Sequence, residues 1–523
     1  MRPNPFTPAS APSTGNKAGI LVAVYVATLA INLDVTIVNV ALPSIATELD
    51  AGTRGLQWVV DGYNLAFAAL VLAAGSLSDR YGRRPALILG LLGFAAASVA
   101  GALVDGTGAL ILARFGMGVF AALIFPTTLS IISNTFGDRR QRAAAIGGWG
   151  AVVGVGVASG PVTGGLLLEH FYWGSVFLAL VPPALAAAAL TFLLVPESRD
   201  PSVPRLDLRG LMVSIGFLGL LTYTVIEGPE RGWDNTATLL GFAGSTVLLA
   251  AFVAVERASE HPMLDVQLFT DRRFSAASGA VAVTFFALAG FIFLITLYFQ
   301  VVRGFSPLST GARILPVALA IAVASVLGGT LAPRVGTKSV VVTGLLSFGT
   351  AMAWIAGSIE VDTAYWSTIV PQMVLMGLGM GLISTSATES IMVVLPPARA
   401  GVGSAVNDAT RELGSTLGVA VIGSVFSSVF GSRLLDGPFA ATGHAKEAAE
   451  SVPVAFGIAG DQPALLAAAQ DSFLDALTIA CIVVAGLCYA AALAGIAALP
   501  GRRFNAHASL ASEAVRTDAG DAA

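Results

Sequence analysis

Two residues of opposite charge lie inside long apolar stretches in the first quarter of the chain. Asp34 is about 16 residues into the first stretch, and Arg114 is about six residues into the fourth. At about 1.5 Å per helical residue, both fall at comparable depth in the same half of a membrane. A lone charge there costs at least about 2.5 kcal/mol, so we expect the two to pair. A carboxylate that gains and loses such a partner can carry a proton; a static structural ion pair is the alternative.

A second group of charges lies late in the sequence. Asp408, Arg411 and Glu412 have the i, i+3, i+4 spacing that places side chains on one helix face. Glu389, in the preceding apolar stretch, is expected at a similar depth. Three acids around one arginine leave uncompensated negative charge, so one acid should be protonated at neutral pH. Structural pairing and a role in proton coupling or substrate binding both remain open.

A further acid, Asp61, lies near one end of the second apolar stretch, between Trp58 and Tyr63. It either faces water at the membrane rim or serves as an outer proton-entry group or a contact for a cationic substrate.

These charges lie on elements that must be membrane helices. The 523 residues are 55% hydrophobic and only 11% charged, whereas soluble domains have about 25% charged residues. At about 20 apolar residues per span, we expect about fourteen transmembrane helices. The predicted spans are 18–42, 56–77, 86–104, 109–133, 143–166, 174–195, 209–227, 237–256, 275–301, 310–332, 338–357, 366–394, 401–430 and 473–498.

The distribution of basic residues predicts the orientation. An even number of spans places both termini on one side, and that side holds twenty lysines and arginines against six on the other. Basic residues in short loops stay in the cytoplasm, so both termini are expected there. The scarcity of lysine suggests a GC-rich bacterial genome. With the predicted spans and orientation, it indicates a multi-pass protein of a bacterial cytoplasmic membrane.

An internal repeat predicts the architecture. Residues 75–92 align without a gap on 329–346, with seven of eighteen positions identical, and Gly116-Met117-Gly118 recurs as Gly379-Met380-Gly381. Both copies keep the same orientation if two helices are inserted between two sets of six. The expected units are a tail at 1–17, a six-helix bundle at 18–200, two inserted helices at 201–262, a six-helix bundle at 263–499 and a tail at 500–523. Within the second bundle, 432–471 is expected to be a long external loop, either a mobile cap or a disordered excursion.

Three motifs carry a resemblance to a known family. They are Leu33-Asp34-Val35-Thr36-Ile37-Val38-Asn39-Val40-Ala41-Leu42-Pro43, the loop at 75–84, and Gly156-Val157-Ala158-Ser159-Gly160-Pro161-Val162-Thr163-Gly164-Gly165. The chain resembles the major facilitator superfamily and, more narrowly, its fourteen-helix drug:proton antiporter branch. The resemblance implies an all-α integral membrane fold, arranged 6+2+6, with two pseudo-twofold six-helix bundles.

The resemblance also implies roles for two of the motifs. Small residues at i, i+4 and i+8 let a neighbouring helix approach closely, and the proline permits a bend. The family uses this segment as a hinge between its halves, although ordinary helix packing is the alternative. The hinge residues are Gly156, Gly160, Pro161, Gly164 and Gly165.

The 75–84 loop is similar to the family's gating latch, in which Asp79 would bind a helix N-terminus or an arginine. A positive patch that only sets topology is the alternative. The gating residues are Gly75, Asp79, Arg80, Gly82, Arg83 and Arg84. Arg114 matches the family's helix 4 arginine, but Met117 occupies a position that is often glutamine. The second half has Gly377 where the first has Arg114.

The resemblance implies a proton-coupled antiporter that exports small amphipathic or cationic compounds by alternating access. A lipid or envelope-precursor transporter on the same fold is the alternative, and a receptor or scaffold is disfavoured by the intramembrane acids. No nucleophile–base pair, phosphate-binding G-x-x-x-x-G-K-[ST] or clustered histidine set occurs, so we expect neither an enzyme nor a cofactor. A net charge of −4 disfavours nucleic acid. We expect a monomer driven by the proton motive force, whose partners are the substrate, protons and the bilayer.

Overall fold

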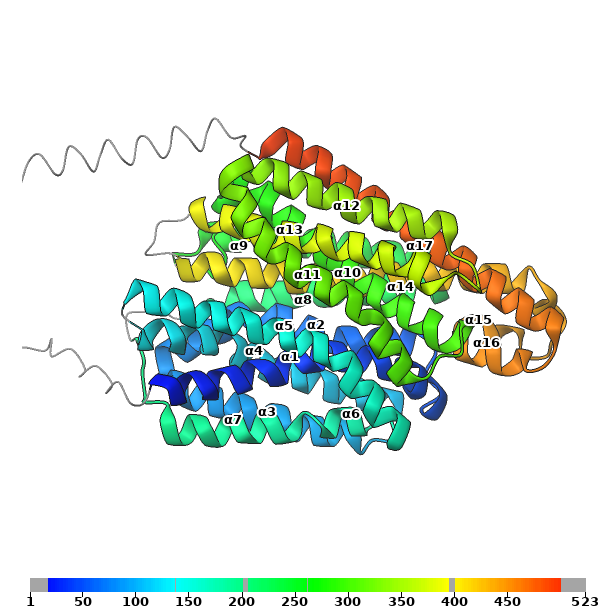
Figure 1. The fold of residues 1–523 in the computed structure, drawn as a ribbon, viewed down its shortest axis with the longest axis horizontal. Coiled ribbons are helices and arrows are strands. Elements are labelled where there is room, and N and C mark those ends of the chain that lie inside the picture. Colours follow the sequence, from blue (N-terminus) through cyan, green and yellow to red (C-terminus); the bar gives the residue numbers. More distant parts are fainter. Residues whose placement is uncertain (1–16, 137, 201–205, 261, 395–399, 500–523) are drawn as a thin grey trace, which may run out of the picture.

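The computed structural model describes residues 17–136, 138–200, 206–260, 262–394 and 400–499, and the predicted tails lie almost wholly outside these ranges. Within them are 14 helices long and apolar enough to cross a membrane, which confirms the expected number. The N-terminal helices (blue to cyan) and the C-terminal helices (green to red) form two groups that run side by side (Figure 1). The all-helical membrane fold predicted from the sequence is therefore confirmed.

The first bundle consists of seven helical segments that make six spans. Its helices are α1 (Lys17–Glu48), α2 (Thr53–Tyr81), α3 (Arg83–Ala102), α4 (Thr107–Thr135), α5 (Arg139–His170), and α6 (Ser175–Leu178) with α7 (Val181–Leu194). The inserted pair is α8 (Leu208–Arg231) and α9 (Thr236–Ala258).

The second bundle follows the short helix η1 (Val266–Thr270). Its spans are α10 (Arg272–Leu297) with the π-helix η2 (Tyr298–Val302), α11 (Pro307–Val335), α12 (Thr337–Ser358), η3 (Tyr365–Ile369) with α13 (Val370–Val394), α14 (Ala400–Leu435) and α17 (Pro463–Ala498). Between α14 and α17 lie η5 (Pro438–Ala441), α15 (Ala445–Glu450) and α16 (Val452–Ala459).

The repeat is visible in the backbone. Gly82 ends α2 with φ +135°, and its counterpart Gly336 ends α11 with φ +93°. Both lie in the region that favours glycine, and each lets the chain turn directly into the next helix. The paired glycines Gly90 of α3 and Gly344 of α12 also match, because each lies against the next spanning helix, α4 in one bundle and α13 in the other.

The two bundles are joined at one end, which we call the outer end because the charge distribution predicts that it faces away from the cytoplasm. Gly165 of α5 packs against the backbone of Leu308 in α11, where no side chain could fit. Gln57 of α2, 1% exposed, donates to Ala420 O of α14 at 3.0 Å and to Ser424 Oγ at 3.3 Å. All hydrogen bonds between the bundles within the described ranges lie in this outer half, so the two bundles are held together there.

The segment 432–471 differs from the expectation. It is not a disordered excursion, since α14 runs on to Leu435 and α17 begins at Pro463, with three short helices between them. Phe439, Ala448 and Val452 are fully buried in the main core. Its small and aromatic residues are therefore packing groups that cover the outer end, where α15 and α16 lie (Figure 1, orange).

The glycine stripe of α5 faces α1. A Cβ on Gly156 would meet Asn32 Cβ at 2.8 Å, and one on Gly164 would meet Ile37 Cγ1 at 2.9 Å. Between them, a Cβ on Gly160 would overlap Thr36 Oγ1 and lie 3.0 Å from the Ile37 nitrogen. The stripe therefore brings the backbones of α5 and α1 together, as close helix packing requires.

Gly160→Val should destabilise the protein by about 1–3 kcal/mol, because overpacking forces α5 away from α1. Thermal unfolding in detergent measures the effect. Gly154→Val is the matched control, since a Cβ at Gly154 meets nothing within 4 Å. Equal unfolding temperatures for the two variants would contradict the packing argument.

Gln57→Leu should weaken the contact between the two bundles at the outer end, since each lost hydrogen bond is worth about 1 kcal/mol. We expect a several-fold faster reaction of a cysteine placed at Ala420, which is fully buried, with a membrane-impermeant maleimide. Cys481 and Cys488 are first replaced by serine. Gln267→Leu, at an exposed glutamine of η1, should leave the rate unchanged.

Candidate functional site

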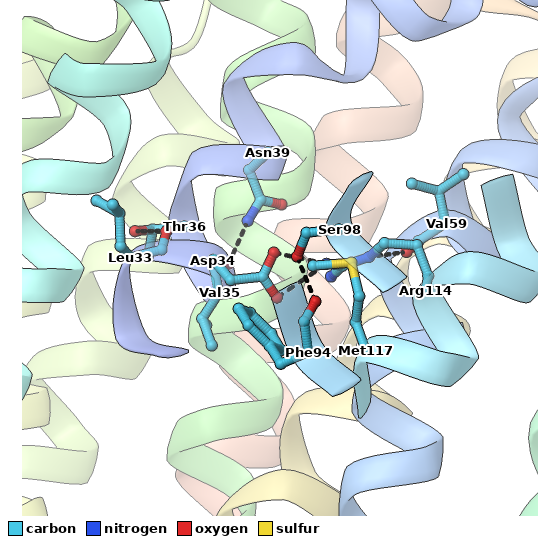
Figure 2. A network of polar contacts seen from close by, with 10 residues as sticks. All are labelled: Leu33, Asp34, Val35, Thr36, Asn39, Val59, Phe94, Ser98, Arg114 and Met117. Carbon is cyan, nitrogen blue, oxygen red and sulfur yellow. Dashed lines mark hydrogen bonds and ion pairs between the residues drawn. The ribbon is translucent and has the colours of Figure 1, made fainter. Parts of the chain in front are cut away.

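Asp34 and Arg114 form a fully buried ion pair between α1 and α4 (Figure 2). Nη1 of Arg114 donates to Oδ1 of Asp34 at 2.7 Å and to Oδ2 at 2.8 Å. Their side chains are 1% and 0% exposed. Removing two charges from water costs several kcal/mol each, which only a close and directed contact can offset. The pairing predicted from the sequence is confirmed.

Arg114 is also fixed by neutral neighbours. Its Nε donates to the carbonyl oxygen of Val59 at 2.9 Å, and its guanidinium lies 4.5 Å from the centre of the Tyr63 ring. Met117, where the family often has glutamine, lies with Sδ 3.8 Å from Nη1 (Figure 2). A thioether is a weak acceptor, so the carboxylate of Asp34 is the dominant partner of the guanidinium.

Close helix packing places the pair. A Cβ on Gly118 would overlap the carbonyl oxygen of Tyr63, so only glycine lets α4 lie this near to α2. On the other side of α1, Thr36 Oγ1 donates to the carbonyl oxygen of Val157 in α5 at 3.1 Å. The site is thus built on helix backbones held in direct contact, which keeps the charged groups in register.

Asp61 does not face water, contrary to one of the two expectations. It is 0% exposed, and neither carboxylate oxygen has a hydrogen-bond partner in the part of the chain that the structure describes. It shares a helix face with Trp58 and Leu65, which pack with Leu218 of the inserted helix α8. The rim position is therefore wrong, and a role for Asp61 in proton entry or substrate contact stays a prediction.

The second charge cluster forms only in part. On α14, Nη1 of Arg411 lies 3.7 Å from Oδ1 of Asp408, a loose ion pair. The guanidinium also lies 4.5 Å from the centre of the Phe285 ring of α10. Glu412 is near enough for its charge to interact with both groups. The one-face arrangement predicted for α14 thus brings its three charged residues together.

Glu389 is not part of this cluster, which corrects the sequence-based prediction. It is exposed on α13, and within the described ranges it makes no ion pair with Arg411. Its charge acts instead on Arg273, at the beginning of α10. Similar depth in two helices does not place two side chains on facing surfaces.

The 75–84 segment, expected to be a loop, is helical except at Gly82, and it binds the segment that leaves the first bundle. Asp79 Oδ1 accepts from Arg83 Nε at 2.7 Å, so its partner is an arginine of the same loop. The Arg83 nitrogen donates to Ser198 O at 3.0 Å, and the Asp200 nitrogen donates to Asp79 O at 2.8 Å. The other gating residues also make contacts: Gly75 lies on Pro126, Arg80 over the Tyr81 ring, Gly82 near Glu197 and Arg84 over the Phe192 ring.

Two buried polar residues of α2, Tyr63 and Gln57, were not among the predicted site residues. Each is 1% exposed and touches a charged group or the opposite bundle. The available signal was the rarity of polar side chains in an apolar span, which by itself does not reveal a partner. No group of three or more metal-ligating side chains occurs within the described ranges.

A comparison with family models identifies the fold family. The model described as Major Facilitator Superfamily matches residues 24–419. The chain belongs to the major facilitator superfamily. This confirms the family that the motifs indicated, and the ion pair, the glycine stripe and the 75–84 loop all lie within the matched region.

Curated relatives cover most of the chain. It is 36% identical over 414 residues to the Multidrug resistance protein Stp of Mycobacterium tuberculosis, covering 79% of this chain and 76% of that protein. It is 35% identical over 486 residues to the Multidrug efflux pump LfrA of Mycolicibacterium smegmatis, covering 92% and 96%. It is 34% identical over 419 residues to the Puromycin resistance protein pur8 of Streptomyces alboniger, covering 80% and 83%.

Solved structures support the fold. A bacterial homologue of the human lysosomal transporter Spinster, in an inward-facing and unoccupied conformation, matches with a TM-score of 0.65 at 18% identity. The match covers 94% of this chain and 99% of that one. The family match and the curated relatives show that the protein is a membrane transporter of this superfamily and not an enzyme.

Removing one partner of the buried pair should destabilise the protein by about 3–5 kcal/mol, because the other charge is left unpaired. Arg114→Gln and Asp34→Asn test this singly, and the double variant should lose clearly less than their sum. Unfolding in mixed detergent micelles gives the free energies. Arg433→Gln breaks an exposed pair with Asp475 and should cost under about 1 kcal/mol.

Proposed function

We propose that this transporter exports small amphipathic or cationic compounds from the cytoplasm in exchange for protons. The observation that carries the proposal is the buried Asp34–Arg114 ion pair. Its aspartate lies on α1, which packs against the glycine stripe of α5. Three relatives, each covering at least 79% of this chain, are named for multidrug resistance, drug efflux or puromycin resistance. Their names support the class of cargo.

The ion pair can couple proton binding by Asp34 to a change in conformation. While Arg114 lies on Asp34, the carboxylate is stabilised as an anion and a proton is held off. If the bundles move so that the guanidinium withdraws, the same buried carboxylate must take up a proton, since an unpaired charge there is costly. A protonated Asp34 in turn releases Arg114, so each step favours the next.

The transport cycle alternates between two openings. The present conformation is closed at the outer end by Gln57 and by the contact of Gly165 with α11. These contacts shield Asp34, which is buried and paired within the first bundle, from water on the outer side. Proton release is therefore directed to the cytoplasm in this state and proton uptake to the outside in the other, which drives export against the substrate gradient.

A lipid or envelope-precursor cargo is the rival, and transport assays separate the two. The purified protein is placed in vesicles with an imposed pH gradient, and movement of a cationic dye and of a fluorescent phospholipid is followed in parallel. Dye movement with proton release supports drug export, whereas phospholipid movement alone supports the rival.

Asp34→Asn should abolish proton-driven accumulation of the dye, at least 100-fold below the wild type, while downhill dye exchange persists. The amide keeps the shape of the carboxylate but cannot exchange a proton. Glu389→Gln, at an exposed acid outside the cluster, should retain near wild-type accumulation. Undiminished proton-driven accumulation by Asp34→Asn would refute the assigned role.

A further inference from the structure

The inserted helix α8 contains a backbone carbonyl that its own helix cannot satisfy. Pro229 lies inside α8 and has no N–H, so it cannot donate a helical hydrogen bond to the carbonyl oxygen of Val225, four residues earlier. Ser424 of α14 replaces this donor, because its hydroxyl donates to Val225 O at 2.8 Å. Side chains of neighbouring helices commonly satisfy carbonyls that a proline frees within a membrane. The proline of α8 thus requires a donor, and the second bundle supplies it.

A second hydrogen bond joins the end of α8 to the same helix. Trp233, just after α8, lies on Gly228, where a Cβ would come within 2.5 Å of the ring. Its Nε1 donates to Ser428 Oγ of α14 at 3.1 Å. Ser424 and Ser428 are four residues apart, so they lie on one face of α14. The outer end of α8 is therefore bound along one stripe of the second bundle.

The contact of α8 with the first bundle is of a different kind. Arg54 of α2 pairs with Glu227 at 3.2 Å and also with Glu230. The side chains of Arg54 and Glu230 are 49% and 41% exposed, so water can replace these partners, and such pairs contribute little stability. The apolar contact of Leu218 with Leu65 can be replaced by lipid chains of equal polarity.

Ser424 also contacts the first bundle, but only as an acceptor. Gln57 Nε2 donates to its oxygen at 3.3 Å, whereas the hydroxyl proton is donated to Val225 O. If α2 moves away from α14, the bond to Gln57 is lost and the bond to Val225 O remains. If α8 moved away from α14 instead, a carbonyl without a helical donor would lie among apolar side chains, which costs more than losing an exposed ion pair.

We propose that α8 and α9 move as part of the second bundle, and that the contact of α8 with α2 is the one that opens when the bundles separate at the outer end. A short turn joins α9 to α8, and α9 packs along α8, so it follows α8. The inference rests on the alternating access of the proposed function.

The test links α8 to one bundle at a time in the full-length protein. After both native cysteines are replaced by serine, a short reducible bismaleimide joins one cysteine pair. Arg54→Cys with Glu230→Cys links α8 to α2, and Trp233→Cys with Ser428→Cys links the end of α8 to α14. Downhill exchange of ethidium across vesicles reports how often the transporter alternates.

The link between α2 and α8 should slow ethidium exchange at least about tenfold, because it prevents the two bundles from separating, and a reductant should restore the exchange. The link between α8 and α14 should leave the exchange within about twofold of the unlinked protein, because these helices stay together. The control is N-ethylmaleimide on the same cysteines, which modifies them without joining them and should have no effect on either pair.

A second measurement tests the chemical reason for the docking. Ser424→Ala should lower the unfolding temperature in detergent, because Val225 O loses its donor. In a Pro229→Ala background, residue 229 gains an N–H that can bond this carbonyl within α8, so Ser424→Ala should lower the temperature by about half as much or less. The lost acceptor for Gln57 contributes equally in both backgrounds, so equal losses would contradict the docking argument.

The outcomes separate this inference from the proposed function. Exchange that the α8–α14 link blocks overturns the inference, and so does exchange that the α2–α8 link leaves intact. Proton release is followed separately. Ethidium exchange by the wild type without proton movement refutes the proposed function, while the comparison of the two links still tests the inference. If only the phospholipid moves, the same comparison is made with that probe.

Discussion

The structure depends on a carboxylate and a guanidinium held together where water is excluded. Asp34 and Arg114 are each costly to bury alone, and their contact is stable only if three helix backbones stay close. Glycines provide this closeness, with Gly118 letting α4 lie on α2 and Gly160 letting α5 lie on α1. The ion pair therefore depends on these glycines, which let the helices that carry it pack closely.

The two halves share a backbone plan but differ in chemistry. Gly82 and Gly336 make the same turn, yet the position that matches Arg114 is Gly377, where a Cβ would lie 2.6 Å from the carbonyl oxygen of Val317. The second bundle therefore uses this position for tight packing of α13 on α11. Its charged cluster lies on α14 instead, where Arg411 is only 3.7 Å from Asp408, so one half carries a close ion pair and the other a looser one.

Apolar span length, internal repetition and the cost of burying charge can all be evaluated from the sequence alone. The fourteen spans, the repeat and the partnership of Asp34 with Arg114 each rest on such physics, and each was found. The placement of Glu389 was wrong, as was one of the two alternatives for Asp61 and for the segment 432–471, because other helices set their environment. Residues distant in sequence decide which way a side chain faces at an interface between helices. They also decide whether an alanine-rich connection is packed.

The inserted helix α8 bridges both bundles near the outer end. Glu227 pairs with Arg54 of α2, while Ser424 of α14 donates to Val225 O of α8 at 2.8 Å and Trp233 donates to Ser428 at 3.1 Å. Because α8 contacts both bundles, it cannot keep both sets of contacts if the bundles move apart. If the bundles separate as in the proposed transport cycle, the contacts of α8 with one of them must therefore break in each cycle.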